Sequence, residues 1–215
     1  MLQVEVYVVG PVSTNCYLIS DEETGRCALI DPGANSSALE SAVRARGVRR
    51  FDYILLTHGH FDHIGAVDYY RELTGAKMAL YRGEESFLRD GSLNLSASFG
   101  MPLPPVQADL LLEDGESLFL GKTEIRLIHT PGHTAGSCCY LAGNLLFSGD
   151  TLFLLSAGRT DFATGDEPTL RASLQKLFAL PGDAAVYPGH DEQTTLRFER
   201  ENNPYAGSRN YDYFD

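Results

Sequence analysis

The amino-acid sequence is poor in the features that mark proteins outside the ordinary globular class. Its 215 residues include no tryptophan and only four cysteines, and no two cysteines have the C-x-x-C spacing of a zinc or redox site. The longest apolar runs are a few residues long, so no segment is predicted to span a bilayer. The opening residues M-L-Q-V-E-V-Y-V-V-G lack the basic-then-apolar layout of a signal peptide. These absences argue against a secreted or membrane protein and favour a cytoplasmic location.

The four cysteines are predicted to be buried free thiols. Cys16 and Cys27 fall in separate predicted strands, which could lie close enough for an oxidative bridge. Cys138 and Cys139 are adjacent, so in a strand their side chains should face opposite sides. Either of these two could approach a functional site from the loop after His133, and the role of the pair stays open.

Basic residues are scarce relative to acidic ones. The chain has 17 Lys and Arg against 29 Asp and Glu, a formal net charge of −12, and no run of basic residues. Proteins that bind nucleic acid usually present a basic track, so nucleic acid is not an expected partner. The hydrophobic fraction of 43% suits an ordinary globular core, and no linker or low-complexity stretch divides the chain. We therefore expect a single domain over residues 1–215, and the sequence carries no signal for an oligomeric state.

Strand and helix patterns alternate in two similar passes along the chain. The first pass predicts strands at 4–9, 16–20, 27–31 and 53–57, and helices at 36–46 and 64–73, the second helix ending at Gly75. The second pass predicts strands at 109–112, 117–120, 123–129, 138–142, 144–148 and 185–187, and helices at 169–180 and 195–201. The motifs D-G, L-G-K and A-G-N predict hairpin turns within the second pass.

Residues 83–106 interrupt this alternation. Short helices are predicted at 84–89 and 93–99, and the M-P-L-P-P that follows can continue neither a helix nor a strand. We expect this insertion to cover part of a functional site. The polar, acidic and aromatic tail at 205–215 is predicted to be a solvated end or an interface strip.

The densest group of chemically active residues is T-H-G-H-F-D-H at 57–63, directly after an apolar run. An isolated histidine beside a buried strand is more often structural, but three of the chain's six histidines lie within six positions here. Crowding imidazoles and carboxylates is costly unless a cation offsets the cost. Side chains two apart in extended backbone project the same way, so His58 and His60 can converge while Asp62 and His63 face a second ion.

Three more ligand-type residues each follow a predicted strand and a glycine. They are His133 in T-P-G-H-T, Asp150 in F-S-G-D-T and His190 in Y-P-G-H-D. The preceding glycines, Gly132, Gly149 and Gly189, permit the close backbone approach that a crowded site demands. In α/β architectures the ends of strands are where ligands collect.

The ordered series T-H-G-H-F-D-H, T-P-G-H-T, S-G-D-T-L-F and Y-P-G-H resembles the metallo-β-lactamase superfamily over essentially the whole chain. The G-R-T-D at 158–161 and the N-N-P at 202–204 are similar to glyoxalase II-like hydrolases, particularly short bacterial members. The resemblance implies an α/β fold of the αββα type, a four-layer sandwich. It also implies that one metal is held by His58, His60 and His133, the other by Asp62, His63 and His190, and that Asp150 bridges them.

The resemblance further implies two divalent metal ions, with zinc favoured and iron or manganese as alternatives. A hydroxide bridging the metals would attack the carbonyl of a thioester such as S-lactoylglutathione, and Asp62 could also move a proton. Asp31 is similar to a buried aspartate that holds the ligand loop, with a turn or cap role as the alternative. Arg159 could anchor a substrate carboxylate or be a surface arginine. His129 has no place in the ligand pattern.

Other functions stay open at this point. Persulfide dioxygenases share G-R-T-D-F, and such an enzyme would hold one iron with His58, His133 and Asp150. A β-lactamase is disfavoured, because those sites do not use Asp150 as a bridge. A binding module stabilised by metal but without catalysis is the non-enzymatic alternative. Only the 25 residues 191–215 follow His190, where long glyoxalase II enzymes carry a helical domain, so recognition of a glutathione conjugate is not settled.

Overall fold

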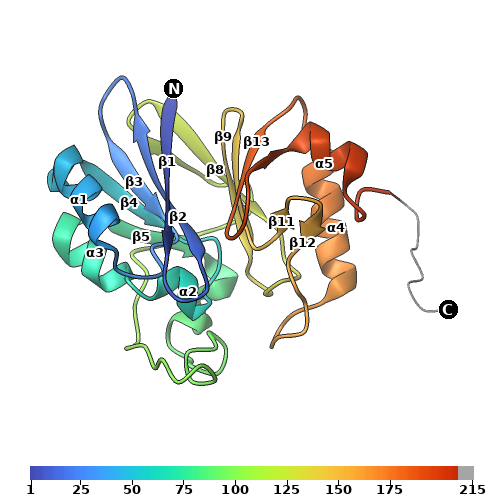
Figure 1. Ribbon diagram of the computed structural model, residues 1–215, viewed down its shortest axis with the longest axis horizontal. Helices are drawn as coiled ribbons and strands as arrows, with labels where there is room; N and C mark the ends of the chain where they lie inside the picture. The colour runs from blue at the N-terminus through green and yellow to red at the C-terminus, as the bar shows by residue number, and fades with distance from the viewer. Residues whose placement is uncertain (208–215) are drawn as a thin grey trace.

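The computed structural model describes residues 1–207, and within them two six-stranded sheets stack face to face (Figure 1). The first sheet has the strand order β1-β2-β3-β4-β5-β6. Its strands are β1 (Leu2–Val9), β2 (Thr14–Asp21), β3 (Cys27–Ile30), β4 (Phe51–Leu55), β5 (Lys77–Tyr81) and β6 (Leu110–Leu112). The first three strands pair antiparallel, whereas β3 to β6 run parallel. Parallel strands need crossover connections, and helices supply them after β3 and β4.

The second sheet has the order β14-β13-β10-β9-β8-β7. Its strands are β7 (Ser117–Leu120), β8 (Thr123–His129), β9 (Cys138–Ala142), β10 (Leu145–Gly149), β13 (Ala185–Pro188) and β14 (Thr194–Thr195). A separate small hairpin pairs β11 (Leu152–Phe153) with β12 (Ser156–Ala157). The two passes seen in the sequence therefore correspond to the two sheets, except that β6, predicted in the second pass, completes the first sheet.

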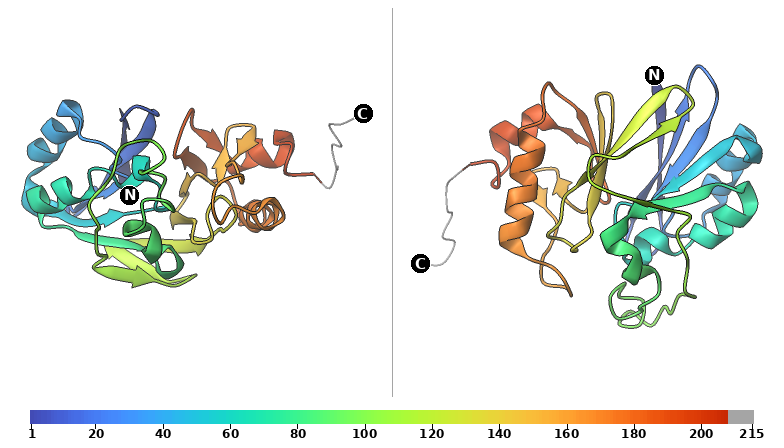
Figure 2. Two further views of the ribbon diagram at one scale, coloured as in Figure 1. Left: turned by 90° about the horizontal axis from the view of Figure 1, so that it is seen from below. Right: turned by 180° about the vertical axis from the view of Figure 1, so that it is seen from behind.

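The longer helices lie on the outer faces of the sheets, and one short α-helical turn lies at the strand ends. The helices are α1 (Ser37–Arg46), α2 (Phe61–Ile64), α3 (Val67–Thr74), α4 (Glu167–Phe178) and α5 (Leu196–Asn202), with short 3-10 helices η1 (Val48–Arg50) and η2 (Arg82–Leu88). Figures 1 and 2 show α1 and α3 against the first sheet, and α4 and α5 against the second. Among residues 1–207 no helix has both the length and the apolar character needed to cross a membrane.

Three apolar layers hold these elements together. On β2, Cys16 and Leu18 pack toward α1 and α3, whereas Tyr17 and Ile19 pack between the sheets. A third cluster lies between the second sheet and α4, which contributes Leu174 among others. The alternation follows from strand geometry, since successive side chains point to opposite faces. Three cores between four layers confirm the predicted αββα sandwich.

The cysteines follow the same alternation. All four are buried free thiols, as predicted. The register of β2 and β3 places Cys27 opposite Ser20 rather than Cys16, so the two thiols lie too far apart along the strands for a bridge. Cys138 faces the core between the sheets and Cys139 faces the core under α4. This pair therefore belongs to the packing of the second sheet.

The sequence prediction missed β5, which lies in the interior of the first sheet between β4 and β6. The strand reads K-M-A-L-Y and has no β-branched residue, so its composition does not favour a strand. Met78, Ala79 and Leu80 are nevertheless fully buried, because parallel neighbours and the layers on both faces cover them. The two-residue strands β11, β12 and β14 were missed as well.

Three other predictions need correction. The helix predicted at 93–99 is a series of turns, because the Asn94 side chain bonds the backbone at Ser96 and Phe87 and so competes with helical hydrogen bonding. The D-G motif at 114–115 joins β6 to β7, which lie in different sheets, and so forms no hairpin. The helix predicted at 64–73 begins only at Val67, as α3, because Ile64 ends the separate turn α2 and the backbone turns at Gly65, where a Cβ would lie 2.4 Å from the Gly33 carbonyl oxygen.

The remaining regular elements lie within a few residues of their predicted bounds, and α3 ends at Gly75 in the left-handed conformation, as predicted. The predicted tail falls mostly on positions 208–215, which lie outside the described residues.

Replacing Leu127 with alanine tests the core between the sheets. Leu127 is fully buried on β8, so Leu127→Ala should lower the free energy of unfolding by about 2–5 kcal/mol. Phe119→Ala on the neighbouring β7 should change it by less than about 0.5 kcal/mol, because Phe119 is 59% exposed. Urea unfolding of metal-depleted protein measures both, and equal losses in the two variants would contradict this packing.

Candidate metal centre

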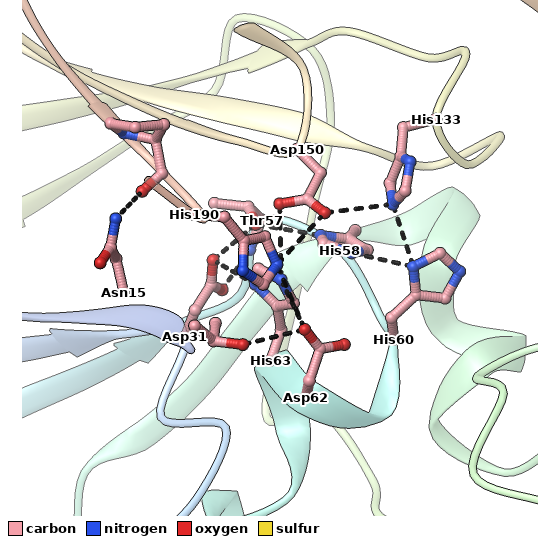
Figure 3. Close-up of polar contacts among 12 residues, drawn as sticks. Asn15, Asp31, Thr57, His58, His60, Asp62, His63, His133, Asp150 and His190 are labelled. Carbon is pink, nitrogen blue, oxygen red and sulfur yellow. Dashed lines mark hydrogen bonds and ion pairs between the residues drawn. The ribbon is translucent and has the colours of Figure 1, made fainter. Parts of the chain in front are cut away.

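The T-H-G-H-F-D-H segment connects β4 to α2 at the carboxyl edge of the first sheet. His58 and His60 lie in the loop, and Asp62 and His63 lie on the single turn of α2. The three histidines are almost completely buried, with exposed fractions of 0–3%. The loop and helical turn together direct all four side chains to one point (Figure 3).

The other three ligand-type residues reach the same point from the second sheet. His133 lies between β8 and β9, Asp150 directly follows β10, and His190 follows β13. The approach is very close: a Cβ at Gly189 would lie 2.2 Å from Asp150 Oδ1 and 2.8 Å from His63 Cε1. Only glycine fits there, as the sequence pattern predicted.

Six of the seven side chains form two groups of three. In the first, His60 Nδ1 lies 3.1 Å from His58 Nε2 and 3.0 Å from His133 Nε2. In the second, Asp62 Oδ2 lies 3.3 Å from His190 Nε2 and 3.5 Å from His63 Nε2. Each group offers three ligand atoms within 4.8 Å of one another, as a metal ion requires.

Asp150 lies between the two groups. Its Oδ1 is 3.5 Å from His63 Nε2, and its Oδ2 is 3.5 Å from His133 Nε2 and 3.6 Å from His190 Nε2. One carboxylate oxygen thus faces the second group alone, and the other faces both. This is the placement that a bridging carboxylate would take.

The chemistry of the donor atoms fits bound cations. His63 Nε2 and Asp150 Oδ1 face the centre and are buried without a hydrogen-bond partner, which is costly for polar atoms removed from water. Imidazole nitrogens and carboxylate oxygens are ligands that zinc, iron and manganese accept. The histidine and aspartate cluster therefore suits divalent metal ions.

Outward contacts fix the orientation of three imidazoles. The Nδ1 of His133 donates to the Arg159 carbonyl at 2.8 Å, and the Nδ1 of His63 lies 3.0 Å from Asp31 Oδ2. His58 Nδ1 lies 3.2 Å from the Thr57 hydroxyl. Each contact occupies one ring nitrogen and leaves the other facing the centre, which is the usual arrangement around metal-binding histidines.

Asp31 also holds the start of the motif. Its Oδ1 accepts the Thr57 N–H at 2.8 Å, and its Oδ2 accepts the Thr57 hydroxyl at 2.6 Å. Asp31 is 2% exposed and has a positive φ of 51°, an uncommon conformation for a residue other than glycine. It therefore supports the ligand loop from behind, through buried contacts that a simple surface turn would not make.

The proton affinities differ between the two groups. Burial, followed by repulsion from neighbouring histidines, lowers the pKa of His58 well below its usual range and that of His60 to about 3. Burial also lowers the pKa of His63, but the surrounding carboxylates, led by Asp62, outweigh burial and raise it to about 10. Without metal, His58 and His60 are neutral at pH 7 and His63 carries a proton.

A pocket of about 430 Å³ opens over the two groups. Its lining includes His60, Asp62, His133, Asp150 and His190 together with the apolar Val12, Phe61, Leu95, Phe99, Phe153, Ala157 and Phe162. Residues 83–106, the covering segment, contribute directly, because the Phe99 ring packs at a tilt against that of Phe61 with centroids 4.9 Å apart and the Asn94 carbonyl accepts the Phe61 N–H at 2.8 Å.

Arg159 lies at the rim of this pocket. Its guanidinium donates twice to Asp161 at 2.6 Å and lies 4.1 Å from the centroid of the Phe162 ring. Its backbone carbonyl, as described above, orients His133. His129 lies outside the pocket and stacks on Tyr81, with ring centroids 4.0 Å apart.

Three residues of β2 that the sequence interpretation did not single out also support the site. Thr14 donates its hydroxyl to Asp62 Oδ2 at 2.9 Å. Asn15 Nδ2 donates to the carbonyls of Pro188 and Asp191, and the Tyr17 hydroxyl also donates to Pro188. The bonds of Asn15 and Tyr17 hold the loop that carries His190 and so connect β2 of the first sheet to the second sheet. Their sequence, T-N-C-Y, reads only as a strand and gives no signal of this role.

Comparisons with known proteins agree with the geometry. The sequence-family model of the metallo-beta-lactamase superfamily matches residues 9–190 of this chain. A probable metallo-hydrolase of Bacillus subtilis, YqgX, is 38% identical over 202 residues, covering 92% of this chain and 94% of its own. The hydroxyacylglutathione hydrolase GloC of Haemophilus influenzae is 32% identical over 217 residues, covering 97% of this chain and 100% of its own.

Two solved structures are similar over nearly the full length. The BLEG-1 B3 metallo-beta-lactamase has a TM-score of 0.89 and 36% identity, covering 96% of this chain and 100% of its own. TTHA1623 in a di-iron-bound form has a TM-score of 0.82 and 34% identity, covering 94% of this chain and 100% of its own.

Metal binding should release protons at neutral pH. Because the pKa of His63 is raised to about 10 without metal, an ion must displace its proton at pH 7, and metal affinity should increase as pH rises toward 10. Isothermal titration calorimetry in two buffers of different ionisation enthalpy measures the protons released. Zero release at pH 7, or an affinity that does not change with pH, would show that His63 is not a ligand.

Asn15→Ala should lower the affinity for the metal ion nearest His190 by about 10-fold, because the variant removes two hydrogen bonds that fix the His190 loop. Competition with a chromogenic chelator measures the affinity. Asn144→Ala, at an exposed turn of the second sheet, is the matched control and should bind metal as the unmodified protein does. Identical affinities in both variants would rule out this role for Asn15.

Proposed function

Because this chain belongs to the metallo-β-lactamase superfamily, we propose that it is a dinuclear metal-dependent hydrolase that cleaves thioesters such as S-lactoylglutathione. The observation that carries the proposal is the position of Asp150 between two complete groups of three ligand atoms. The sequence likeness to a hydroxyacylglutathione hydrolase supports the choice of a thioester. We further propose that the chain acts as one domain, with residues 83–106 as its cover.

We assign His58, His60 and His133 to one ion, Asp62, His63 and His190 to the other, and Asp150 to both. Zinc is the proposed metal, iron is the alternative that the di-iron form of TTHA1623 supports, and manganese has the same ligand preferences. Divalent ions held there would supply Lewis acidity, which makes water nucleophilic near pH 7 and polarises an acyl carbonyl.

The protein's own groups prepare the site for this chemistry. Burial raises the pKa of Asp62, but the adjacent His63, His190 and Thr14 lower it well below its usual range. Asp62 therefore stays ionised, which favours its role as a ligand over a role in proton transfer. Its carboxylate and that of Asp150 both line the pocket, where a substrate carbonyl would lie.

The pocket walls fit a small acyl thioester. Phe61, Leu95 and Phe99 contribute apolar lining, as do Phe162, whose ring centroid lies 5.8 Å from that of His60, and Phe153, whose ring centroid lies 6.3 Å from that of His190. We propose that these walls bind the acyl and thiol carbons and keep bulk water from the reacting bond.

Arg159 is the proposed anchor for a substrate carboxylate. Its ion pair with Asp161 is exposed, with side-chain exposed fractions of 59% and 64%. Pairs of this kind contribute about 0–1 kcal/mol, so an incoming carboxylate can replace Asp161 at little cost.

Two other activities need direct comparison. The similarity to a B3 metallo-beta-lactamase gives a β-lactam more weight as a substrate than the sequence motifs did, since both reactions are attacks on an acyl carbon. A persulfide dioxygenase would need a single iron, whereas the second group of Asp62, His63 and His190 is complete here. This completeness favours the dinuclear hydrolase over the dioxygenase and also over a binding module without catalysis.

Asp150→Ala tests the proposed bridge. The variant should lose one metal ion and at least 10³-fold in kcat/KM toward S-lactoylglutathione, because removing a group that stabilises the transition state costs on this scale. Metal content by mass spectrometry and thioester cleavage measured at the released thiol provide the two readouts. Asp161→Ala, at the exposed rim, should keep both metals and change kcat by less than about threefold.

Metal content and activity assays on the unmodified protein distinguish the candidate functions. Two metals with thioester cleavage support the proposal. Cleavage of a chromogenic cephalosporin with no thioester cleavage would make the protein a β-lactamase, and one iron with oxygen uptake on glutathione persulfide would make it a dioxygenase. Two bound metals without turnover of any substrate would favour the binding module.

A further inference from the structure

Glu84 is a buried carboxyl that the metal centre as described above does not use. It lies on η2 within the covering segment and is 0% exposed. Burying a carboxyl is costly, and its apolar neighbours on η2, Phe87 and Leu88, fill space without that cost. Packing alone therefore does not account for this side chain.

One oxygen of Glu84 holds the loop between two ligands. Its Oε1 accepts the Gly59 N–H at 2.9 Å, and Gly59 separates His58 from His60. The loop also packs directly on η2, because a Cβ at Gly59 would lie 2.4 Å from Phe87 Cβ. The backbone between the two histidines is thus fixed by both a hydrogen bond and a steric contact.

The other oxygen faces the loop that follows His133. A Cβ at Gly136 would lie 2.3 Å from Glu84 Oε2 and 2.7 Å from the Glu84 nitrogen, so this loop also packs on η2. Oε2 is buried without a hydrogen-bond partner, and the Thr134 hydroxyl and Gly136 amide are the donor groups on that side. Burial raises the pKa of Glu84 to about 7, although these donors and Gly59 lower it in part.

The structure assigns Glu84 the role of a positioning residue that ties the His58 to His60 loop to the loop after His133 and so sets the spacing of the first group. The two loops come from different sheets, and η2 lies against both. The assignment rests on the proposed metal site. It makes the covering segment part of the support of the metal centre as well as a wall of the pocket.

Glu84→Ala should lower the affinity for one of the two metal ions by about 10- to 100-fold, which is the usual effect of removing a group that orients metal ligands. Chelator competition with Co²⁺ measures the affinity, and the visible spectrum of the cobalt-loaded protein should change because the histidine geometry changes. Neither readout depends on turnover. Glu84→Gln keeps one oxygen for the Gly59 N–H, so its cobalt affinity should fall by about 10-fold or less. This variant also tests the assignment if Glu84→Ala does not fold.

Two control variants separate positioning from general stability. Glu85→Ala removes a partly exposed carboxylate of the same helix, which pairs with Arg89, and should change neither readout. Glu199→Ala removes another fully buried carboxylate, one that bonds Leu155, Thr194 and Asn203 outside the ligand loops. It should lower the melting temperature of metal-free protein and leave cobalt affinity unchanged.

Unmodified affinity and spectrum in both Glu84 variants would overturn the assignment while leaving the proposed function intact. An equal loss of cobalt affinity in Glu199→Ala would also overturn it, since the effect would then follow stability alone. Failure of the unmodified protein to bind cobalt would instead contradict the proposed metal site itself.

Discussion

The structure depends on bringing five imidazoles and two carboxylates together, largely out of water, where two sheets meet. Removing such groups from solvent is costly unless opposite charge or hydrogen bonds offset the cost. The protein offsets part of it with contacts behind the proposed ligands, such as those of Asp31 and Thr14, and leaves the inward-facing His63 Nε2 and Asp150 Oδ1 without hydrogen-bond partners. The sandwich supplies the rigid strand ends from which these side chains converge.

Much of the architecture was accessible from the sequence because it follows from local periodicity. Alternation along strands such as β2 and β8 and the glycine that ends α3 predicted most elements within a few residues. The motif series also named all seven side chains that the structure brings together, although their role as ligands remains a prediction. β5 was missed because burial by neighbouring strands, rather than its own composition, makes it a strand.

The supporting residues were largely beyond sequence reasoning because their partners are distant in the chain. Asn15 and Tyr17 form hydrogen bonds with a loop more than 170 positions away. The Glu84 carboxylate accepts the N–H of Gly59, which lies 25 positions away in a different loop. The Arg159 prediction concerned its guanidinium, whereas the contact that orients His133 comes from its backbone carbonyl. A carbonyl is common to every residue, so no residue type could have indicated it.

Each group of ligand atoms draws on both sheets, and this has a consequence for synthesis of the chain. When β6 has been made, four of the seven proposed ligands exist, yet neither group is complete. The first group is completed when His133 emerges, and the second only after β13, when His190 follows. Assembly of the proposed centre is thereby deferred until the second sheet has formed, so a stalled or truncated chain that ends before β8 lacks any complete group of three potential metal ligands.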